Sequence, residues 1–98
     1  MHALDALANP VRRKILLELR RAPLPVSAIA KRFPVSRPAI SRHLRVLEEA
    51  GLLEVREDGS QHIYAVRVQG FRAVQTFLDS FWDTALSRLE ALSKEPRK

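Results

Sequence analysis

The sequence predicts a mainly α-helical fold that contains one β-hairpin, in the order helix, helix, helix, helix, hairpin, helix. Apolar residues recur at helical spacing as far as about residue 50, alternate with polar residues from about 53 to 66, and return to helical spacing after Gly70. Capping and turn residues stand where these periods begin and end, so the local signals agree with one another. At 98 residues, the chain is expected to form a single domain over residues 1–98.

The first two helices are separated by a capping signal. A short helix is expected over residues 2–8. Asn9 is a favoured N-cap residue, and Pro10 suits the first helical position because an N–H there would have no helical partner. The second helix is expected to reach about residue 21, ahead of two prolines. Its inward-facing stripe consists of Val11, Ile15, Leu16 and Leu19.

A third and a fourth helix follow, with a tight connection between them. The third is expected from Val26 to Phe33. The fourth is expected to start after an N-cap at Ser36 and to reach about Ala50, with Gly51 at the C′ position. The apolar stripe of the fourth helix consists of Ile40, Leu44 and Leu47.

The alternating segment predicts two short strands, over residues 53–56 and 62–66. The dipeptide Asp58-Gly59 between them is a strong hairpin signal. A final helix is expected to run from Gly70 to about Ser93, and residues 94–98 are expected to fray. Three helices followed by a hairpin is the winged helix-turn-helix arrangement, to which we assign the chain; here a further short helix precedes these three.

Composition narrows the classes of partner. A net charge of +6 and an isoelectric point near 10.8 favour a polyanion, with nucleic acid ahead of an anionic membrane surface. The absence of cysteine excludes disulfides, thiolate metal sites and a cysteine nucleophile. No apolar run approaches the roughly 20 residues that span a bilayer, and no secretory signal precedes the first helix. We therefore expect a cytoplasmic protein that does not insert into membranes.

Catalytic chemistry has no support in the sequence. The few carboxylates and histidines form no acid/base pair, no local feature activates a nucleophile, and there is no phosphate-binding loop. We expect no catalytic residue, no cofactor and no enzymatic activity.

The fourth helix carries the candidate contacts with double-stranded DNA. In a helix-turn-helix the second helix lies in the major groove, and arginine pairs bidentately with guanine or grips phosphate. With its apolar stripe turned inward, a rotation of about 100° per residue turns its basic and small residues outward. A solvated basic face is the alternative, and His43 either contacts DNA or packs at the edge of the core. The candidates on this helix are Ser36, Arg37, Pro38, Ser41, Arg42, His43 and Arg45.

The hairpin is the candidate wing. Arg56, Gln61 and His62 flank its tip and are expected to reach phosphates or the adjacent minor groove. Acidic residues at 54, 57 and 58 make this wing less basic than one built only to grip DNA. The alternative is a hairpin that only covers the core.

Two segments resemble a known family. Residues 8–16 (ANPVRRKIL) look like the opening of the arsenic-repressor (ArsR) family, and residues 36–52 (SRPAISRHLRVLEEAGL) are very close to that family's recognition helix. The match covers residues 4–68. The resemblance implies a sequence-specific regulator that binds an imperfect inverted repeat upstream of its own operon as a homodimer, represses it, and is released by a signal.

The metal sites of that family are not matched. Its arsenic and cadmium sensors carry a cysteine pair on the third helix, where residues 26–30 here are VSAIA. Others use Asp and His pairs on the last helices, but the last helix here has no histidine. His2, His43 and His62 fall on three different elements. We expect no metal site, as in a subgroup of autorepressors that residues 81–92 resemble, with a partner protein or a small molecule as the regulatory signal.

The final helix has more apolar residues than one docking stripe needs. We expect residues 70–93 to pack on the chain's own core and also on a second protomer, as a dimerisation helix together with the first helix. A wide face against the core alone is the alternative. The leading interface candidates are Leu4, Leu7, Phe77, Phe81, Trp82 and Leu89.

Two other binding functions remain open at this level. A general DNA-coating protein would share the positive charge but would not need an arginine-rich recognition helix behind an N-cap. A protein-interaction module that had lost DNA binding would not need the arginines at 37, 42 and 45.

Overall fold

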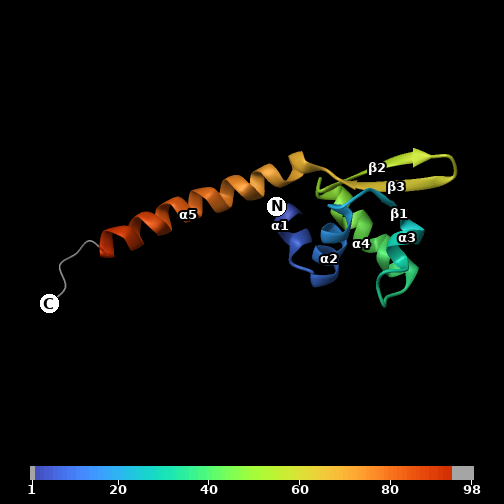
Figure 1. The fold of residues 1–98 in the computed structure, drawn as a ribbon, viewed down its shortest axis with the longest axis horizontal. Coiled ribbons are helices and arrows are strands. Elements are labelled where there is room, and N and C mark those ends of the chain that lie inside the picture. The colour runs from blue at the N-terminus through green and yellow to red at the C-terminus, as the bar shows by residue number, and fades with distance from the viewer. Residues whose placement is uncertain (1, 94–98) are drawn as a thin grey trace.

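The computed structural model describes residues 2–93, so the predicted fraying of residues 94–98 lies outside the described residues. Figure 1 shows a head of short helices and a small sheet, from which one long helix projects. The elements in chain order are α1 (His2–Leu7), α2 (Pro10–Leu19), β1 (Leu24–Pro25), α3 (Val26–Ala30), α4 (Arg37–Glu49), β2 (Leu53–Asp58), β3 (Gln61–Val66), the 3₁₀ turn η1 (Val68–Phe71) and α5 (Arg72–Ser93).

The predicted helix caps are confirmed. The Asn9 side chain accepts hydrogen bonds from the backbone N–H groups of Val11 and Arg12, at 2.8 and 3.1 Å, and Pro10 opens α2. The Ser36 hydroxyl accepts from the N–H of Ala39 at 3.2 Å. These bonds satisfy N–H groups that have no partner within the helix, which is why both helices begin at the residues that the sequence predicts.

The core lies where the apolar stripes of α2, α3 and α4 meet the sheet. Ile40, Leu44 and Leu47 are completely buried, which confirms the inward face predicted for α4. Ile15 of α2 is also completely buried, and Leu19 of the same helix is almost so. The inward orientation of these stripes leaves the opposite face of each helix to solvent.

The sheet has one strand more than the sequence predicts. Its order is β1-β3-β2, all antiparallel, with Leu24 opposite Tyr64 and Pro25 opposite Ile63. We expected a hairpin alone, because a two-residue strand containing a proline is too short to show alternation. The hairpin itself is confirmed and is longer than expected, with Gly59 at a φ of +63° in its turn.

Three helix boundaries differ by two residues or more from those predicted. α3 ends at Ala30, not at Phe33, because Phe33 precedes Pro34 and a residue before proline disfavours helical geometry. α2 ends at Leu19 and not at residue 21. The segment after β3 begins as η1 and becomes an α-helix at Arg72, two residues after the predicted start at Gly70.

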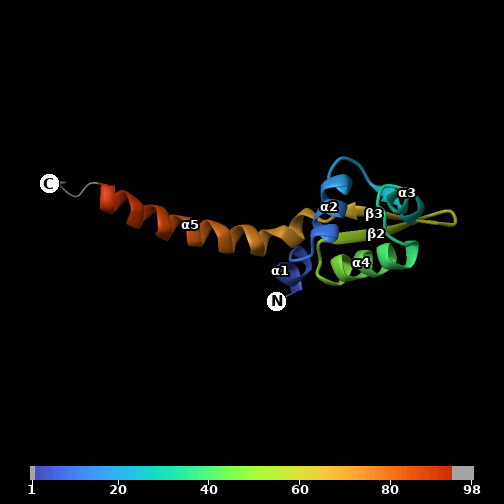
Figure 2. The same ribbon diagram turned by 90° about the horizontal axis from the view of Figure 1, so that it is seen from below.

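The last helix makes far less contact with its own core than expected. Val74 is its one buried residue, and beyond the first turns the helix extends away from the head (Figures 1 and 2). The radius of gyration is 18.3 Å and the longest dimension 68 Å, whereas a compact domain of 100 residues has a radius of gyration of about 13 Å. No helix within residues 2–93 is long and apolar enough to cross a membrane.

Candidate DNA-binding surface

The outward face of α4 carries a cluster of exposed polar and basic side chains. The structure exposes six of the seven predicted contacts: Ser36, the N-cap just before α4, and Arg37, Pro38, Ser41, Arg42 and Arg45 on the helix itself. Within residues 2–93, none of the three arginines forms an ion pair with a carboxylate. Figure 2 shows α4 along one edge of the head, so this face is open to a large ligand. We call these six residues the α4 face.

His43 lies apart from the α4 face. Its ring is half-buried, and its Nδ1 atom is 3.4 Å from a terminal nitrogen of Arg12 on α2. Because a guanidinium only donates hydrogen bonds, Nδ1 accepts and the ring proton of the neutral form lies on Nε2. Of the two interpretations left open by the sequence, the geometry therefore favours packing at the edge of the core.

Arg12 connects three helices. Its Nε donates to the carbonyl oxygen of Ala6 at 2.8 Å and another nitrogen donates to that of Asp5 at 3.3 Å, while Arg13 donates to Leu7 at 2.8 Å. Carbonyls at the end of a helix have no helical partner, and a cation there also interacts favourably with the helix dipole. Arg12 thus caps α1 and contacts the imidazole of His43 on α4. Arg12 is not part of the apolar stripe of α2, and its position in the family-like segment 8–16 is the one signal in the sequence for this role.

Burial lowers the pKa of His43 below its ordinary value of 6.5, and the positive charges of Arg12 and Arg42 lower it further. We expect Arg12→Gln to raise the pKa of His43 towards 6.5, as followed by the imidazole resonances in an NMR pH titration. The control is Arg13→Gln, which removes an equal charge from the same turn without facing the ring. An unchanged pKa in Arg12→Gln would show that the two side chains are not in contact in solution.

The same shift has a consequence for stability. The unfolded chain binds a proton at His43 more readily than the folded protein does. The neutral His43 side chain therefore makes its full contribution to the free energy of unfolding above about pH 6.5. It is lost as the pH falls from there towards the lower pKa of the folded state. His43→Gln is expected to remove that part of the pH dependence.

The three predicted wing residues do not form one surface. Successive side chains of a strand point to opposite faces, so Arg56 and Gln61 lie on one face of the hairpin and His62 on the other. The face of His62 also carries Tyr64, which packs against the core. Glu57 stands opposite His62 in the pairing. All three predicted residues are exposed near the tip, but only two of them can contact DNA with one face of the wing.

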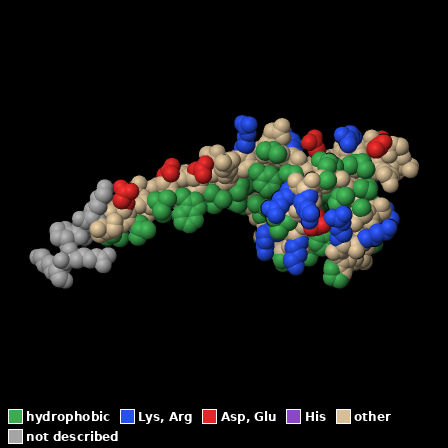
Figure 3. Space-filling model, viewed as in Figure 1, with side chains coloured by type: hydrophobic (Ala, Val, Ile, Leu, Met, Phe, Trp, Pro, Cys, Tyr) green, Lys and Arg blue, Asp and Glu red, His purple; other side chains and the backbone are tan. Residues whose placement is uncertain are grey.

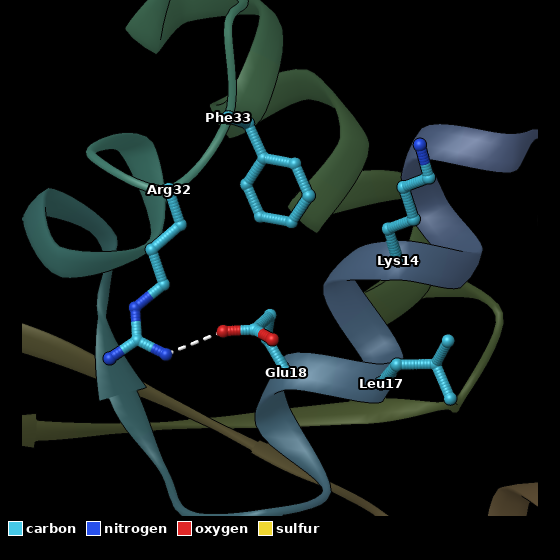
Figure 4. Close-up of a pocket in the computed structure, with 5 residues that line it drawn as sticks. All are labelled: Lys14, Leu17, Glu18, Arg32 and Phe33. Carbon is cyan, nitrogen blue, oxygen red and sulfur yellow. Dashed lines mark hydrogen bonds and ion pairs between the residues drawn. The ribbon is translucent and has the colours of Figure 1, made fainter.

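A hollow of about 300 Å³ lies between α2 and the turn that leads into α4 (Figure 4). Across it, Arg32 from the turn forms an ion pair with Glu18 of α2, and the Phe33 ring and Leu17 line its walls. Both charged side chains are partly exposed, and pairs of this kind contribute about 0–1 kcal/mol. The pair ties the helix-turn-helix turn to α2, a contact that spans 14 residues and that sequence reasoning did not find.

Apolar side chains are exposed along α5. Seven large ones are between 43% and 62% exposed: Phe77, Leu78, Phe81, Trp82, Leu86, Leu89 and Leu92. Figure 3 shows apolar side chains as a band along one edge of the helix, with carboxylates along the opposite edge. We call these seven residues the α5 face.

The two interface candidates on α1 differ from each other. Leu4 is 40% exposed, whereas Leu7 packs partly against the chain's own core. The buried residues of α1 are Ala3 and Ala6 instead. Of the two leucines, only Leu4 is exposed, slightly less than the residues of the α5 face.

Residues 7–56 match a family model described as a helix-turn-helix domain. The chain is 44% identical over 85 residues to the HTH-type transcriptional regulator Rv2034 of Mycobacterium tuberculosis, an alignment that covers 87% of this chain and 79% of that protein. Its fold is similar to a crystal structure described as a possible transcriptional regulator for arsenical resistance, with a TM-score of 0.79, 41% identity, and coverage of 97% of this chain and 99% of the other.

A second similar structure is the solution structure of the homodimeric winged helix-turn-helix DNA-binding domain Mb0332 of Mycobacterium bovis, a possible ArsR-family regulator. It has a TM-score of 0.67 and 30% identity, with coverage of 80% of this chain and 76% of the other. The proteins that this chain resembles are transcriptional regulators and not enzymes. The helix-turn-helix, the wing and these similarities together show that the chain belongs to the ArsR family of winged helix-turn-helix transcriptional regulators.

Proposed function

We propose that this protein is a repressor that binds an inverted-repeat operator as a homodimer, with the α4 face in the major groove. The observation that carries the proposal is that Arg37, Arg42 and Arg45 are exposed together and are not neutralised by carboxylates within the described chain. Three guanidinium groups held on one rigid helix can pair bidentately with guanine or bind phosphate. Arg56 and Gln61, on the outer face of the wing, would add contacts beside the groove.

The homodimer is supported by the α5 face. Soluble monomers rarely expose seven large apolar side chains along one side of a helix, because contact between apolar surface and water is unfavourable. The α5 face lies on a helix of 22 residues that extends away from its own head. A second copy of the same helix is a partner of matching length and shape. Leu4 lies on the other helix that we assign to the interface. The homodimeric state of the Mycobacterium bovis domain agrees with this assignment.

A two-fold dimer leads directly to the form of the operator. Symmetric homodimers present identical recognition helices related by a two-fold axis, and such a pair matches two half-sites of opposite orientation. Occupying promoter DNA in the cytoplasm would block transcription of the adjacent genes, including the operon of the regulator itself. We propose that a partner protein or a small molecule near the last helices, and not a metal ion, releases the dimer.

Selection of bound fragments from a random DNA pool by the full-length protein tests this function. We expect the bound fragments to share an inverted repeat, and affinity for it to exceed that for random DNA by at least about a thousandfold at physiological salt. A reporter placed behind the selected sequence is expected to lose expression when the protein is present. Equal affinity for selected and random DNA would instead indicate a DNA-coating protein, and an increase in reporter expression would exclude repression.

Metal ions are expected to leave operator affinity unchanged. Soft metals and zinc require thiolate or imidazole ligands, and within residues 2–93 the structure contains no group of three His, Cys, Asp or Glu side chains that could hold an ion. Metal-free protein is titrated with operator in the absence and presence of zinc, cadmium, copper or arsenite. A tenfold change that a chelator reverses, about 1.4 kcal/mol of coupling, would reveal a site outside this set.

A further inference from the structure

Two glycines bring the end of the recognition helix against the start of α5. A Cβ atom built on Gly70 would lie 1.8 Å from the carbonyl oxygen of Gly51 and 2.6 Å from its carbonyl carbon. These atoms belong to the backbone, which cannot move aside as a flexible side chain does. The two chain segments therefore approach as closely as they do only because residue 70 has no side chain. We call this contact the glycine joint.

The Gly51 side of the joint is the C-terminal cap of α4. Gly51 has a φ of +79°, its N–H donates to the carbonyl of Glu48 at 2.9 Å, and the N–H of Leu52 donates to that of Leu47 at 3.0 Å. This pair of bonds is the Schellman motif, which ends a helix rigidly with glycine in the left-handed conformation. A shift of the Gly51 carbonyl would therefore be passed to the last turn of α4.

The Gly70 side of the joint is equally constrained. The backbone N–H of Arg67 donates to the carbonyl of Leu52 at 2.9 Å, and its side chain donates to that of Gly51 at 3.4 Å. The N–H of Gly70 donates in turn to the carbonyl of Arg67 at 3.0 Å. Immediately after the joint, Phe71 and Val74 pack on the core. The direction of α5 is thus set within its first turn.

We propose that the glycine joint sets the angle between the recognition helix and the dimerisation helix, and thereby the separation of the two recognition helices in the dimer. Gly70 is then a positioning residue for operator spacing. The proposal rests on the dimeric function proposed above.

The length of α5 amplifies small changes at the joint. Its 22 residues extend about 33 Å at about 1.5 Å per residue. A tilt of about 10° at one end therefore moves the other end by about 6 Å. One base-pair step of DNA rises only about 3.4 Å. A change at the joint that leaves the head folded is accordingly large enough to shift the preferred spacing of half-sites by a base pair or more.

The test is Gly70→Ala in the full-length protein, with Gln69→Ala as a matched control in the same turn, where the side chain is exposed. Binding is measured on the selected operator and on versions with up to two base pairs added or removed between the half-sites. The wild-type protein and Gln69→Ala are expected to prefer the native spacing. Gly70→Ala is expected to remain dimeric in sedimentation, to lose at least tenfold in affinity at the native spacing, and to bind best at a different one.

A second variant covers the case in which circular dichroism shows that Gly70→Ala does not fold. Inserting two glycines between Gly70 and Phe71 introduces no clash but frees α5 from the joint. This variant is expected to form dimers and to bind the different spacings with affinities that agree within about threefold.

The outcomes separate this inference from the function on which it rests. If the wild-type protein selects no inverted repeat, the proposed function fails. If the wild-type protein does select an inverted repeat, two results would show that the glycine joint does not set the spacing and that the inference is wrong. In the first, both variants keep the spacing preference of the wild-type protein; in the second, both variants no longer form dimers.

Discussion

Replacing Arg42 and Arg45 together by alanine is expected to lower affinity for the selected operator. The expected loss lies between about thirtyfold and about ten thousandfold. Each bidentate contact with a base contributes about 1–3 kcal/mol, and about 1.4 kcal/mol corresponds to a factor of ten. Both side chains are exposed on the side of α4 opposite its buried stripe, so their removal leaves the core intact. Each single variant is also expected to relax sequence preference at one position of the half-site. Binding is measured by titration at several salt concentrations.

The matched control is the double variant Arg20→Ala, Arg21→Ala. It removes the same charge from exposed positions just after α2, outside the α4 face. We expect a small loss that is similar on operator and random DNA, because general attraction to phosphates carries no sequence information. Equal losses in the two double variants would mean that charge alone drives binding, and the assignment of the α4 face to base recognition would be wrong.

Introducing glutamate at Phe81 and Leu89 is expected to convert the dimer into monomers and to lower operator affinity by at least a hundredfold. Both side chains are more than half exposed in the single chain, so neither contributes to the core of its own head. In a dimer they would be buried, and burying unpaired carboxylates is costly. Monomers bind each half-site separately and lose the gain of simultaneous engagement. Sedimentation velocity and operator titration measure the two effects.

The control for this variant is Thr76→Glu, Ser87→Glu, which adds the same charge on the opposite, polar side of α5. It is expected to remain dimeric and to bind operator with nearly wild-type affinity. Glutamate is a good helix former, so helix content by circular dichroism should be preserved in both variants. Persistence of the dimer in the Phe81, Leu89 variant would place the interface elsewhere, with the exposed Leu4 of α1 as the next position to change.

The sequence by itself determined the helices, their caps and the orientation of α4. Asn9 and Ser36 cap helices because their side chains accept hydrogen bonds from N–H groups two or three residues further along the chain. The spacing of Ile40, Leu44 and Leu47 likewise fixes which side of α4 faces outward, once helical geometry is given. Such interactions join residues within one or two helical turns, so a short stretch of sequence is enough to predict them.

Contacts between distant segments were decided only by the tertiary structure. Leu24 is a strand residue because it pairs with Tyr64, 40 positions away. Arg12 is a cap and a neighbour of His43 because α1, α2 and α4 meet at one place. Neither role leaves a periodic trace in the sequence.

The direction of α5 is the clearest case. Its apolar residues predict burial but do not say against what, and we expected its own core to cover part of them. In the structure, the close approach of Gly70 to Gly51 and the anchoring of Val74 direct the helix away from the head. The apolar side of an amphipathic helix can pack against its own core or against a second copy of the same helix. Only the packing of its first turn determines which of the two surfaces it meets.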